Sequence, residues 1–225
     1  MSVRTILGCF LMGSLLCGAP AFAALKVAHL IKPLAPGDSP EVRIEAPVGS
    51  LRAETWDDTS VLVEVELECV GEVEPCRDAA SSVALSSEKS AEALSIRVAG
   101  PWTVEDKEQP RNKILEDRGW HLTARIQVFY PASRRLWVLL ESGAVEVRGL
   151  ESDGRIRIER GSAAVTMRQR DAGSLRLGTD KGGAVIRRPG EQPLHDKKLL
   201  EWRQGDGGCA LEVELGEGEI VVDLL

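Results

Sequence analysis

The feature that most restricts the fold of this chain is an alternation of apolar and charged residues that recurs along most of its length. In segment 61–68, valine or leucine occupies every odd position, and glutamate occupies positions 64, 66 and 68. Successive side chains of a β-strand point to opposite faces, so this period places the apolar set on one face and the charged set on the other. Similar runs occur at 41–45, 83–85, 94–98, 122–130 and 136–140. The sequence therefore predicts an all-β fold of half-buried strands with little helix.

The second half of the sequence adds a repeat. After Pro131, apolar pairs recur about every ten residues with a glycine near most turns, and Ala144-Val145, Ala164-Val165 and Ala184-Val185 lie twenty residues apart. Evenly spaced short strands are compatible with an up-and-down sandwich, whereas a repeated unit favours stacked rungs. We therefore expect a single-stranded β-helix or β-solenoid-like stack of short strands, with its terminal unit capping the stack.

The expected organisation has four parts. Residues 1–23 form a signal peptide, 24–40 an extended lead-in, 41–131 an antiparallel β region, and 132–225 the repeat rungs. The dense charge between Glu105 and Arg118, together with Pro110, predicts a long exposed loop at 101–119. An insertion at 187–199 is expected to interrupt the rungs.

The first residues have the pattern of an export signal. Arg4 precedes an apolar run from Ile6 to about Gly18, and Ala21-Phe22-Ala23 supplies a small-x-small cleavage pattern. The apolar run is shorter than the roughly 20 residues that a membrane-spanning helix needs. A lipoprotein signal ending at Cys17 is the alternative, but Leu15-Leu16 before that cysteine are large. We expect cleavage near Ala23 and an exported protein that does not span the membrane, in the periplasm or at the cell surface.

Charge and cysteine content restrict the partners. The formal charge is −7, and loss of Arg4 with the signal makes it −8, which argues against nucleic acid and anionic lipid as partners. The mature chain would retain Cys69, Cys76 and Cys209. Gly71 and Pro75 can turn the chain between the first two, so a Cys69–Cys76 disulfide is favoured over two buried thiols or a metal site. Cys209 is left over and is expected to be buried.

Several segments resemble a known family. Glu41-Val-Arg-Ile-Glu-Ala-Pro-Val-Gly-Ser-Leu51 is similar to the opening of the exported DUF4097 group, which also carries the label of adhesin. Val128-Phe-Tyr-Pro131, Leu136-Trp-Val138 and Ser142-Gly-Ala-Val-Glu-Val-Arg-Gly-Leu150 resemble the middle of the same group. The likeness covers about residues 41–225. It implies an all-β, solenoid-like fold and an exported envelope protein, and it transfers no functional residues.

Motifs for catalysis are weak. Ser86-Ser-Glu-Lys89 matches a serine acyl-enzyme signature, but it lies in a polar turn between two strand patterns. The three histidines lie in different segments, and His121 is expected on the polar surface of a strand. Gln204-Gly-Asp206-Gly-Gly208 holds too few acids for calcium. We therefore expect no catalytic residue set, no metal site and no cofactor.

Tryptophan is the residue type that points to a binding surface. There are five tryptophans but one tyrosine and three phenylalanines. Exposed tryptophan on a β-surface can stack on sugar rings or anchor a protein, although each ring can also cover an edge of the core. Trp137 is the foremost candidate, with Trp120 and Trp202 behind it. The expected function is a non-catalytic, adhesin-like or scaffolding module that binds an envelope protein or polysaccharide. The alternative is a carbohydrate-active enzyme that uses a carboxylate pair on a β-helix. The sequence leaves the oligomeric state open.

Overall fold

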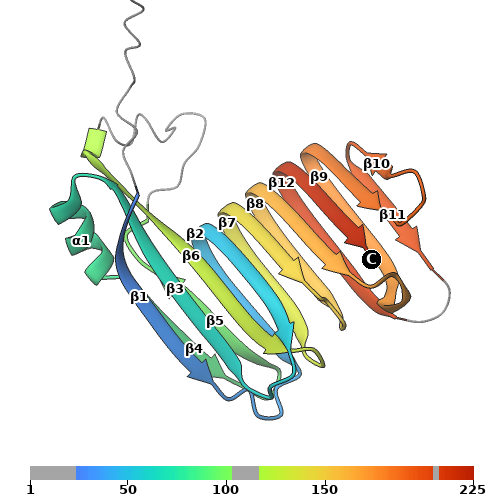
Figure 1. Cartoon of the computed structure of the whole chain (residues 1–225), viewed down its shortest axis with the longest axis horizontal. Helices are drawn as coiled ribbons and strands as arrows, with labels where there is room; N and C mark the ends of the chain where they lie inside the picture. The colour runs from blue at the N-terminus through green and yellow to red at the C-terminus, as the bar shows by residue number, and fades with distance from the viewer. Residues whose placement is uncertain (1–23, 103–116, 205–207) are drawn as a thin grey trace, which may run out of the picture.

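The computed structural model describes residues 24–102, 117–204 and 208–225, and this part of the chain is almost entirely β-structure (Figure 1). The predicted signal peptide, residues 103–116 of the predicted loop and residues 205–207 of the glycine-rich turn lie outside the described residues. The elements are β1 (Leu25–Leu34), β2 (Glu41–Trp56), β3 (Val61–Gly71), α1 (Val73–Ser81), β4 (Ala84–Lys89), β5 (Ala93–Ala99), β6 (Trp120–Pro131), β7 (Arg135–Arg148), β8 (Gly154–Met167), the 3₁₀ turn η1 (Gln169–Asp171), β9 (Ala172–Arg187), β10 (Leu194–Asp196), β11 (Leu199–Arg203) and β12 (Cys209–Leu224). The expectation of an all-β fold is confirmed.

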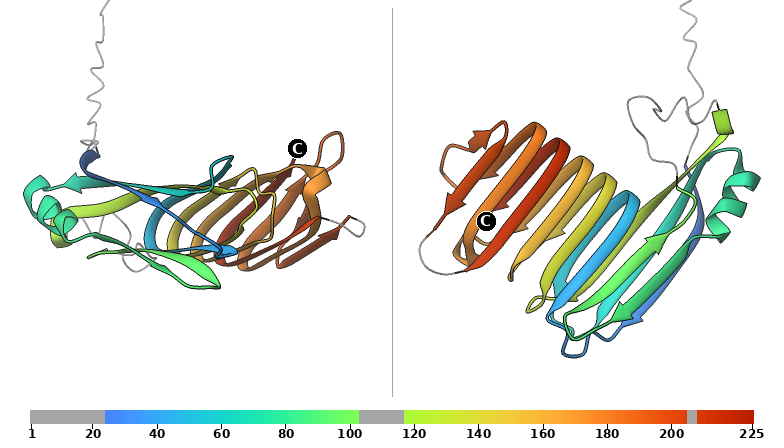
Figure 2. Two further views of the ribbon diagram at one scale, coloured as in Figure 1. Left: turned by 90° about the horizontal axis from the view of Figure 1, so that it is seen from below. Right: turned by 180° about the vertical axis from the view of Figure 1, so that it is seen from behind.

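The centre of the molecule is a stack of long parallel strands. β2, β7, β8, β12 and β9 are neighbours in that order, and each is hydrogen-bonded to the next in parallel. Every one of these strands bends at a glycine, so that the arm before the bend and the arm after it lie in two layers (Figure 2). β5 and β11 extend the first layer at its two ends, and β6 and β10 extend the second.

The space between the layers is the hydrophobic core. One row across the first layer consists of side chains that are at most 1 % exposed and that lie in register from strand to strand: Ile44, Val138, Ile156, Val213 and Leu177. Along each strand, the charged residues that alternate with these buried side chains face outward, as the alternation of the sequence predicts. Burial on one face of each arm therefore fixes the register of the stack.

The bends form a column of glycines. Gly49, Gly143, Gly161, Gly218 and Gly182 have φ between 128° and 150°, a region that other residues rarely adopt. A Cβ atom on Gly161 would overlap the backbone carbonyl of Gly143, and one on Gly218 would overlap that of Gly161. The column thus requires glycine for two reasons, its backbone conformation and the close approach of the neighbouring strand.

The order of strands in space differs from their order in the sequence. β12, the last strand of the chain, lies between β8 and β9 rather than at the end of the stack. The expectation that the terminal unit caps the stack is therefore wrong. β9 skips one strand position and β12 fills it, while β10 and β11 lie along β9 at that end of the molecule. A single-stranded helix of rungs in chain order is not what forms.

The twenty-residue repeat of Ala-Val pairs is also not the structural repeat. Ala144 is exposed and lies opposite Ser162, whereas Ala184 is fully buried. Gly143 and Gly161 are aligned across β7 and β8 but lie eighteen residues apart in the sequence. The Ala-Val pairs therefore fall out of register, and a shift of one residue moves a side chain to the opposite face.

The N-terminal region completes the second layer. β1, β3 and β6 pair antiparallel, so the expected lead-in at 24–40 contains an edge strand. The segment expected to turn between Cys69 and Cys76 continues into helix α1. The structure joins the two cysteines in a disulfide, with Cα atoms 5.9 Å apart, which holds α1 against the end of β3.

Candidate binding groove

A groove of about 490 Å³ crosses the outer surface of the first layer, near the N-terminal ends of the five stacked strands. Its lining comes from six strands, β2, β7, β8, β12, β9 and β11. Neighbouring strands lie about 4.8 Å apart, so the groove extends about 24 Å along the stack. This surface is elongated, open and rigidly supported, because all the lining residues except Asp153 belong to strands of the core.

One row of outward side chains runs along the groove. The register of the strands aligns Arg43 with Trp137, Trp137 with Arg155, and Arg155 with Glu212. The row continues from Glu212 to Arg176 and from Arg176 to Glu201. Trp137 is thus placed in a charged groove, flanked by arginine on both neighbouring strands.

Trp137 and Arg43 form a cation–π contact. The guanidinium carbon of Arg43 lies 4.7 Å from the centroid of the Trp137 ring. An Nη atom of Arg43 also lies 2.9 Å from a carboxylate oxygen of Glu41. The ring and the carboxylate together fix the position of this guanidinium.

The other arginines of the groove are loosely held. Nε of Arg155 lies 3.3 Å from Glu212, and Arg176 lies 3.7 Å from Glu201 and 3.9 Å from Glu212. A close charge-assisted N–H···O hydrogen bond is about 2.7–2.9 Å long. Among the described residues, no ion pair involves Arg135 or Arg203, which also line the groove.

Some arginines on other surfaces of the molecule are held more tightly. Arg97 lies 2.7 Å from Glu45 at the β5 end of the first layer, and Arg148 lies 2.6 Å from Glu146 on the second layer. These carboxylates lie within hydrogen-bonding distance of their arginines. Within the groove, Arg155 and Arg176 make only long ion pairs, so most of their hydrogen-bond donors are not used by the fold.

A second groove of about 570 Å³ adjoins the first, and Arg176 and Glu212 line both. It lies nearer the glycine bends and adds Arg157 and Lys198 to the cationic groups of this face. Arg157 is 4.0 Å from Glu214, another long ion pair. The charged surface consequently continues beyond the main groove over β8, β12 and β9.

The remaining tryptophans are placed differently. Trp120 and Trp202, both half-buried, pack against the hydrophobic core, and so does Trp102. Trp56 stacks on Phe129 with ring centroids 5.5 Å apart, and its Nε1 donates to the carbonyl oxygen of Ser60. The structure brings neither Trp120 nor Trp202 into the groove of Trp137.

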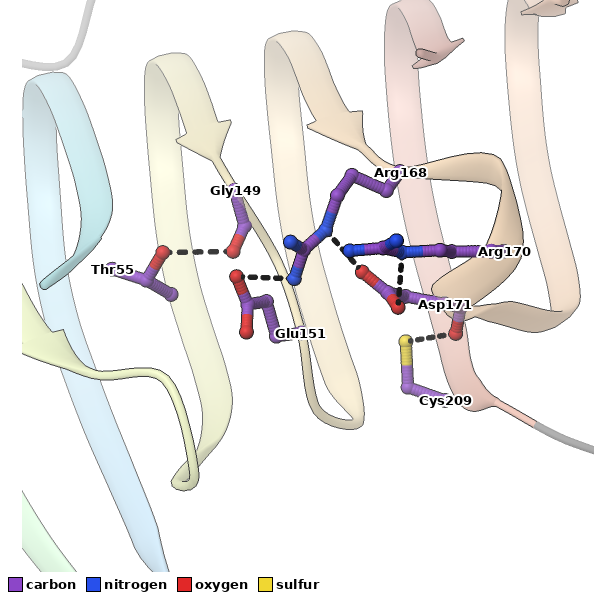
Figure 3. Close-up of polar contacts among 7 residues, drawn as sticks. All are labelled: Thr55, Gly149, Glu151, Arg168, Arg170, Asp171 and Cys209. Atoms are coloured by element: carbon purple, nitrogen blue, oxygen red, sulfur yellow. Dashed lines mark hydrogen bonds and ion pairs between the residues drawn. The ribbon is translucent and has the colours of Figure 1, made fainter. Parts of the chain in front are cut away.

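A polar cluster outside the groove connects the turns that follow β7 and β8 (Figure 3). Arg168 lies 2.7 Å from Glu151 and 2.6 Å from Asp171, and its hydrogen bond to Asp171 raises the pKa of its guanidinium. The thiol of Cys209 donates to the carbonyl oxygen of Asp171 over 3.1 Å, and burial raises the pKa of that thiol. The cluster ties the turn after β7 to the turn after β8 and to the start of β12. Its groups are used in holding the turns together.

His121 is the one histidine whose position contradicts the sequence expectation. It is only 3 % exposed, because α1 packs against β6 and covers the face on which a surface histidine was expected. Within the described ranges, no group of three histidine, cysteine, aspartate or glutamate side chains is placed to bind a metal ion. In the same part of the chain, no helix is long and apolar enough to cross a membrane.

The fold and groove define a class of protein: an all-β chain with a two-layered stack of bent strands and a charged groove across one face. Neither a family model nor a curated protein matches the sequence. The DUF4097 likeness therefore stays a resemblance.

Solved structures that match the chain include two described as adhesion proteins. The first is a "putative cell adhesion protein" from Clostridium sporogenes ATCC 15579, with a TM-score of 0.51 and 10 % identity, covering 88 % of this chain and 99 % of the other. The second is a "putative adhesin" from Parabacteroides distasonis ATCC 8503, with a TM-score of 0.24 and 8 % identity, covering 88 % and 97 %. At these values the first match shows a shared fold alone, and we base no argument on the second.

Proposed function

We propose that this chain is an exported, non-catalytic, adhesin-like binding module of the cell envelope, and that the groove around Trp137 is its binding surface. The observation that carries the proposal is the row of outward side chains in register across six strands, with arginines whose donors the fold leaves unused. A rigid, elongated surface suits recognition of an extended partner. The fold shared with a protein described as a cell adhesion protein supports the same role.

Two features support export. The first 23 residues have the n-region, apolar run and small-x-small pattern of a signal peptide. The Cys69–Cys76 disulfide is of the kind that persists in oxidising compartments. We place the mature protein in the periplasm or at the cell surface, with Ala24 as its first residue. Mass spectrometry of the N-terminus of the secreted protein tests this cleavage site.

Sedimentation with envelope fragments tests the binding surface. The purified mature protein is mixed with envelope fragments of the cell that makes it, and the bound fraction is measured in the pellet. Arg155→Glu reverses a charge in the groove, and Arg148→Glu makes the same change on the second layer. These arginines are matched, since their side chains are 51 % and 45 % exposed.

We expect the parent and Arg148→Glu proteins to sediment with the fragments and the Arg155→Glu protein to stay in solution. Absence of binding by the parent protein would contradict a role as an envelope-binding module. An equal loss in both variants would show that the groove is not the binding surface.

One observation keeps an alternative open. The groove holds Trp137 together with several carboxylates, Glu41, Asp153, Glu201 and Glu212, as a carbohydrate-active enzyme would require. Each of these carboxylates already contacts an arginine or a backbone N–H of the fold. Release of reducing ends from polysaccharides, abolished by Glu212→Gln, would favour the enzyme over the binding module.

A further inference from the structure

We propose that the groove binds a linear acidic polysaccharide, laid along the stack of strands so that its anionic groups meet a track of arginines. This inference rests on the proposed binding function and names the chemical class of the ligand. Ligands of this class are chains of sugar rings that carry carboxylate or sulfate groups at intervals.

The track is built from one arginine per strand. β2 contributes Arg43, β7 Arg135, β8 Arg155, β9 Arg176 and β11 Arg203, all of which line the groove. Only β12, in the middle, contributes an acid instead, Glu212. The groove therefore presents cationic groups over its whole length of about 24 Å, on a protein whose overall charge is −7.

The guanidinium groups have hydrogen-bond donors to offer. An arginine has five N–H donors in a fork that fits a carboxylate or a sulfate with two parallel hydrogen bonds. Arg155 and Arg176 make ion pairs of 3.3–3.9 Å, and Arg135 and Arg203 make none with the described residues. An anionic ligand can thus bind without first breaking a short ion pair.

Trp137 acts in this groove by positioning a cation. The guanidinium of Arg43 lies over the ring, 4.7 Å from its centroid, and so covers a face on which a neutral sugar would stack. The next strand places Arg155 beside the ring on the other side. We therefore assign Trp137 as a positioning residue for Arg43, which replaces the expectation of an open platform for sugar rings.

The acids of the groove argue for a sugar polymer rather than another polyanion. Glu41, Glu201 and Glu212 lie among the arginines and would repel a polyanion that has no hydroxyl groups to donate to them, such as polyphosphate. The same carboxylates accept hydrogen bonds from the hydroxyl groups between the charges of an acidic polysaccharide. The alternation of donors and acceptors along the groove is complementary to that spacing of charge.

Binding of defined polymers to the purified mature protein tests the proposal. Biolayer interferometry measures the affinity for polygalacturonate, which carries carboxylates, for dextran sulfate, for neutral dextran and for inorganic polyphosphate. The double variant Arg135→Gln with Arg203→Gln removes two groove cations. Its control, Arg52→Gln with Arg148→Gln, removes two exposed cations from the second layer.

We expect polygalacturonate, dextran sulfate or both to bind. Which of the two binds more tightly shows whether the groove prefers carboxylate or sulfate groups. The groove variant should lose about tenfold or more in affinity, and the slope of log K against log salt should become shallower. The control should change less than about twofold, as expected for exposed pairs. Trp137→Phe should keep most of the affinity, because a phenyl ring still supports Arg43, whereas Trp137→Ala should lower it.

Three results would overturn the inference: dextran bound as tightly as the acidic polymers, polyphosphate bound more tightly than either, or equal losses in the groove and control variants. Loss of envelope binding in Arg155→Glu, without affinity for any acidic polysaccharide, would refute the ligand class and leave the binding function in place.

Discussion

Substitution of the corner glycine Gly161 by alanine tests how the stack is held together. Gly161 has φ of 140°, and a Cβ atom there would overlap the carbonyl oxygen of Gly143 on β7. A non-glycine residue in such a backbone region costs on the order of 1–3 kcal/mol. Forcing the two strands apart adds an overpacking cost of about 1–3 kcal/mol. Alanine also restricts the unfolded chain, which stabilises the fold by about 0.4–1 kcal/mol. The free energy of unfolding should therefore fall by about 3 kcal/mol.

Two other glycines separate these causes. Gly190 has φ of 71°, but no atom lies within 4 Å of the place that a Cβ atom would occupy, so Gly190→Ala carries only the backbone cost, about 1–2 kcal/mol. Gly183 has no positive φ, and its nearest neighbour is the carbonyl oxygen of Asp196 at 3.6 Å. Gly183→Ala should be neutral or stabilise the fold by up to about 1 kcal/mol.

Thermal and urea unfolding followed by circular dichroism measures the series. At about 2–4 °C per kcal/mol for a protein of this size, Gly161→Ala should lower the Tm by about 6–12 °C, Gly190→Ala by less, and Gly183→Ala not at all. If Gly161→Ala unfolds at the same temperature as Gly190→Ala, the close approach of the strands contributes nothing. The reasoning about the glycine column would then be refuted.

Three further predictions concern the rest of the fold. Replacing Cys69 and Cys76 by serine should lower stability by about 2.5 kcal/mol or more on the chain-entropy model, seen as a Tm drop that reduction of the parent reproduces; an unchanged Tm would contradict it. Cys209 should react slowly with a thiol reagent at pH 8 in the native protein and rapidly in urea, because burial raises the pKa of its thiol and so lowers the thiolate fraction; equal rates would contradict its burial. Deleting residues 209–225 should abolish cooperative unfolding rather than shorten the stack, because β12 lies between β8 and β9; a cooperative transition in the truncated chain would contradict this placement.

The period-two pattern predicted the faces of the strands well. The valines of β3 at positions 61, 63 and 65 are fully buried, and Glu64, Glu66 and Glu68 of the same strand lie on its opposite, partly exposed face. Alternation determines the buried face locally, because a strand has only two faces. A cysteine pair separated by seven residues is equally local, and the structure joins it. Such features depend on neighbours in the sequence and can be recognised without the fold.

The register of the stack was not predicted, because the wrong marker was chosen. Ala-Val pairs are common in strands, and nothing restricts such a pair to one particular place in each strand. The glycines of the column are restricted to the bend, since the backbone conformation and the neighbouring carbonyl both exclude a side chain at Gly161. Aligning the sequence on Gly143, Gly161, Gly182 and Gly218 would have given the register of four strands. Glycines in equivalent places of successive units are therefore the stronger marker of a bend.

The groove combines a residue that the sequence predicted with several that it missed. Trp137 was recognised because Leu136, Val138 and Leu140 occupy the other face of its strand. The arginines were missed because their alignment depends on the strand order, which the pattern of a single strand does not reveal. Arg155 and Arg176, for example, are two strands apart only because β12 separates β8 from β9.

The charges of the strands are compatible with that order. β8 carries Arg155 and β9 carries Arg176, and both are aligned with Glu212 of β12. If β8 and β9 were direct neighbours in the same register, the two arginines would lie opposite each other, and like charges in that position are destabilising. Insertion of β12 instead places a carboxylate between them, at 3.3 and 3.9 Å. Two residues further along, Arg157 of β8 is aligned with Glu214 of β12, although β9 places Gly178 rather than an arginine on the other side. The same insertion that removes this repulsion spaces the guanidinium groups along the groove, so the position of the last strand sets the charge pattern of this surface.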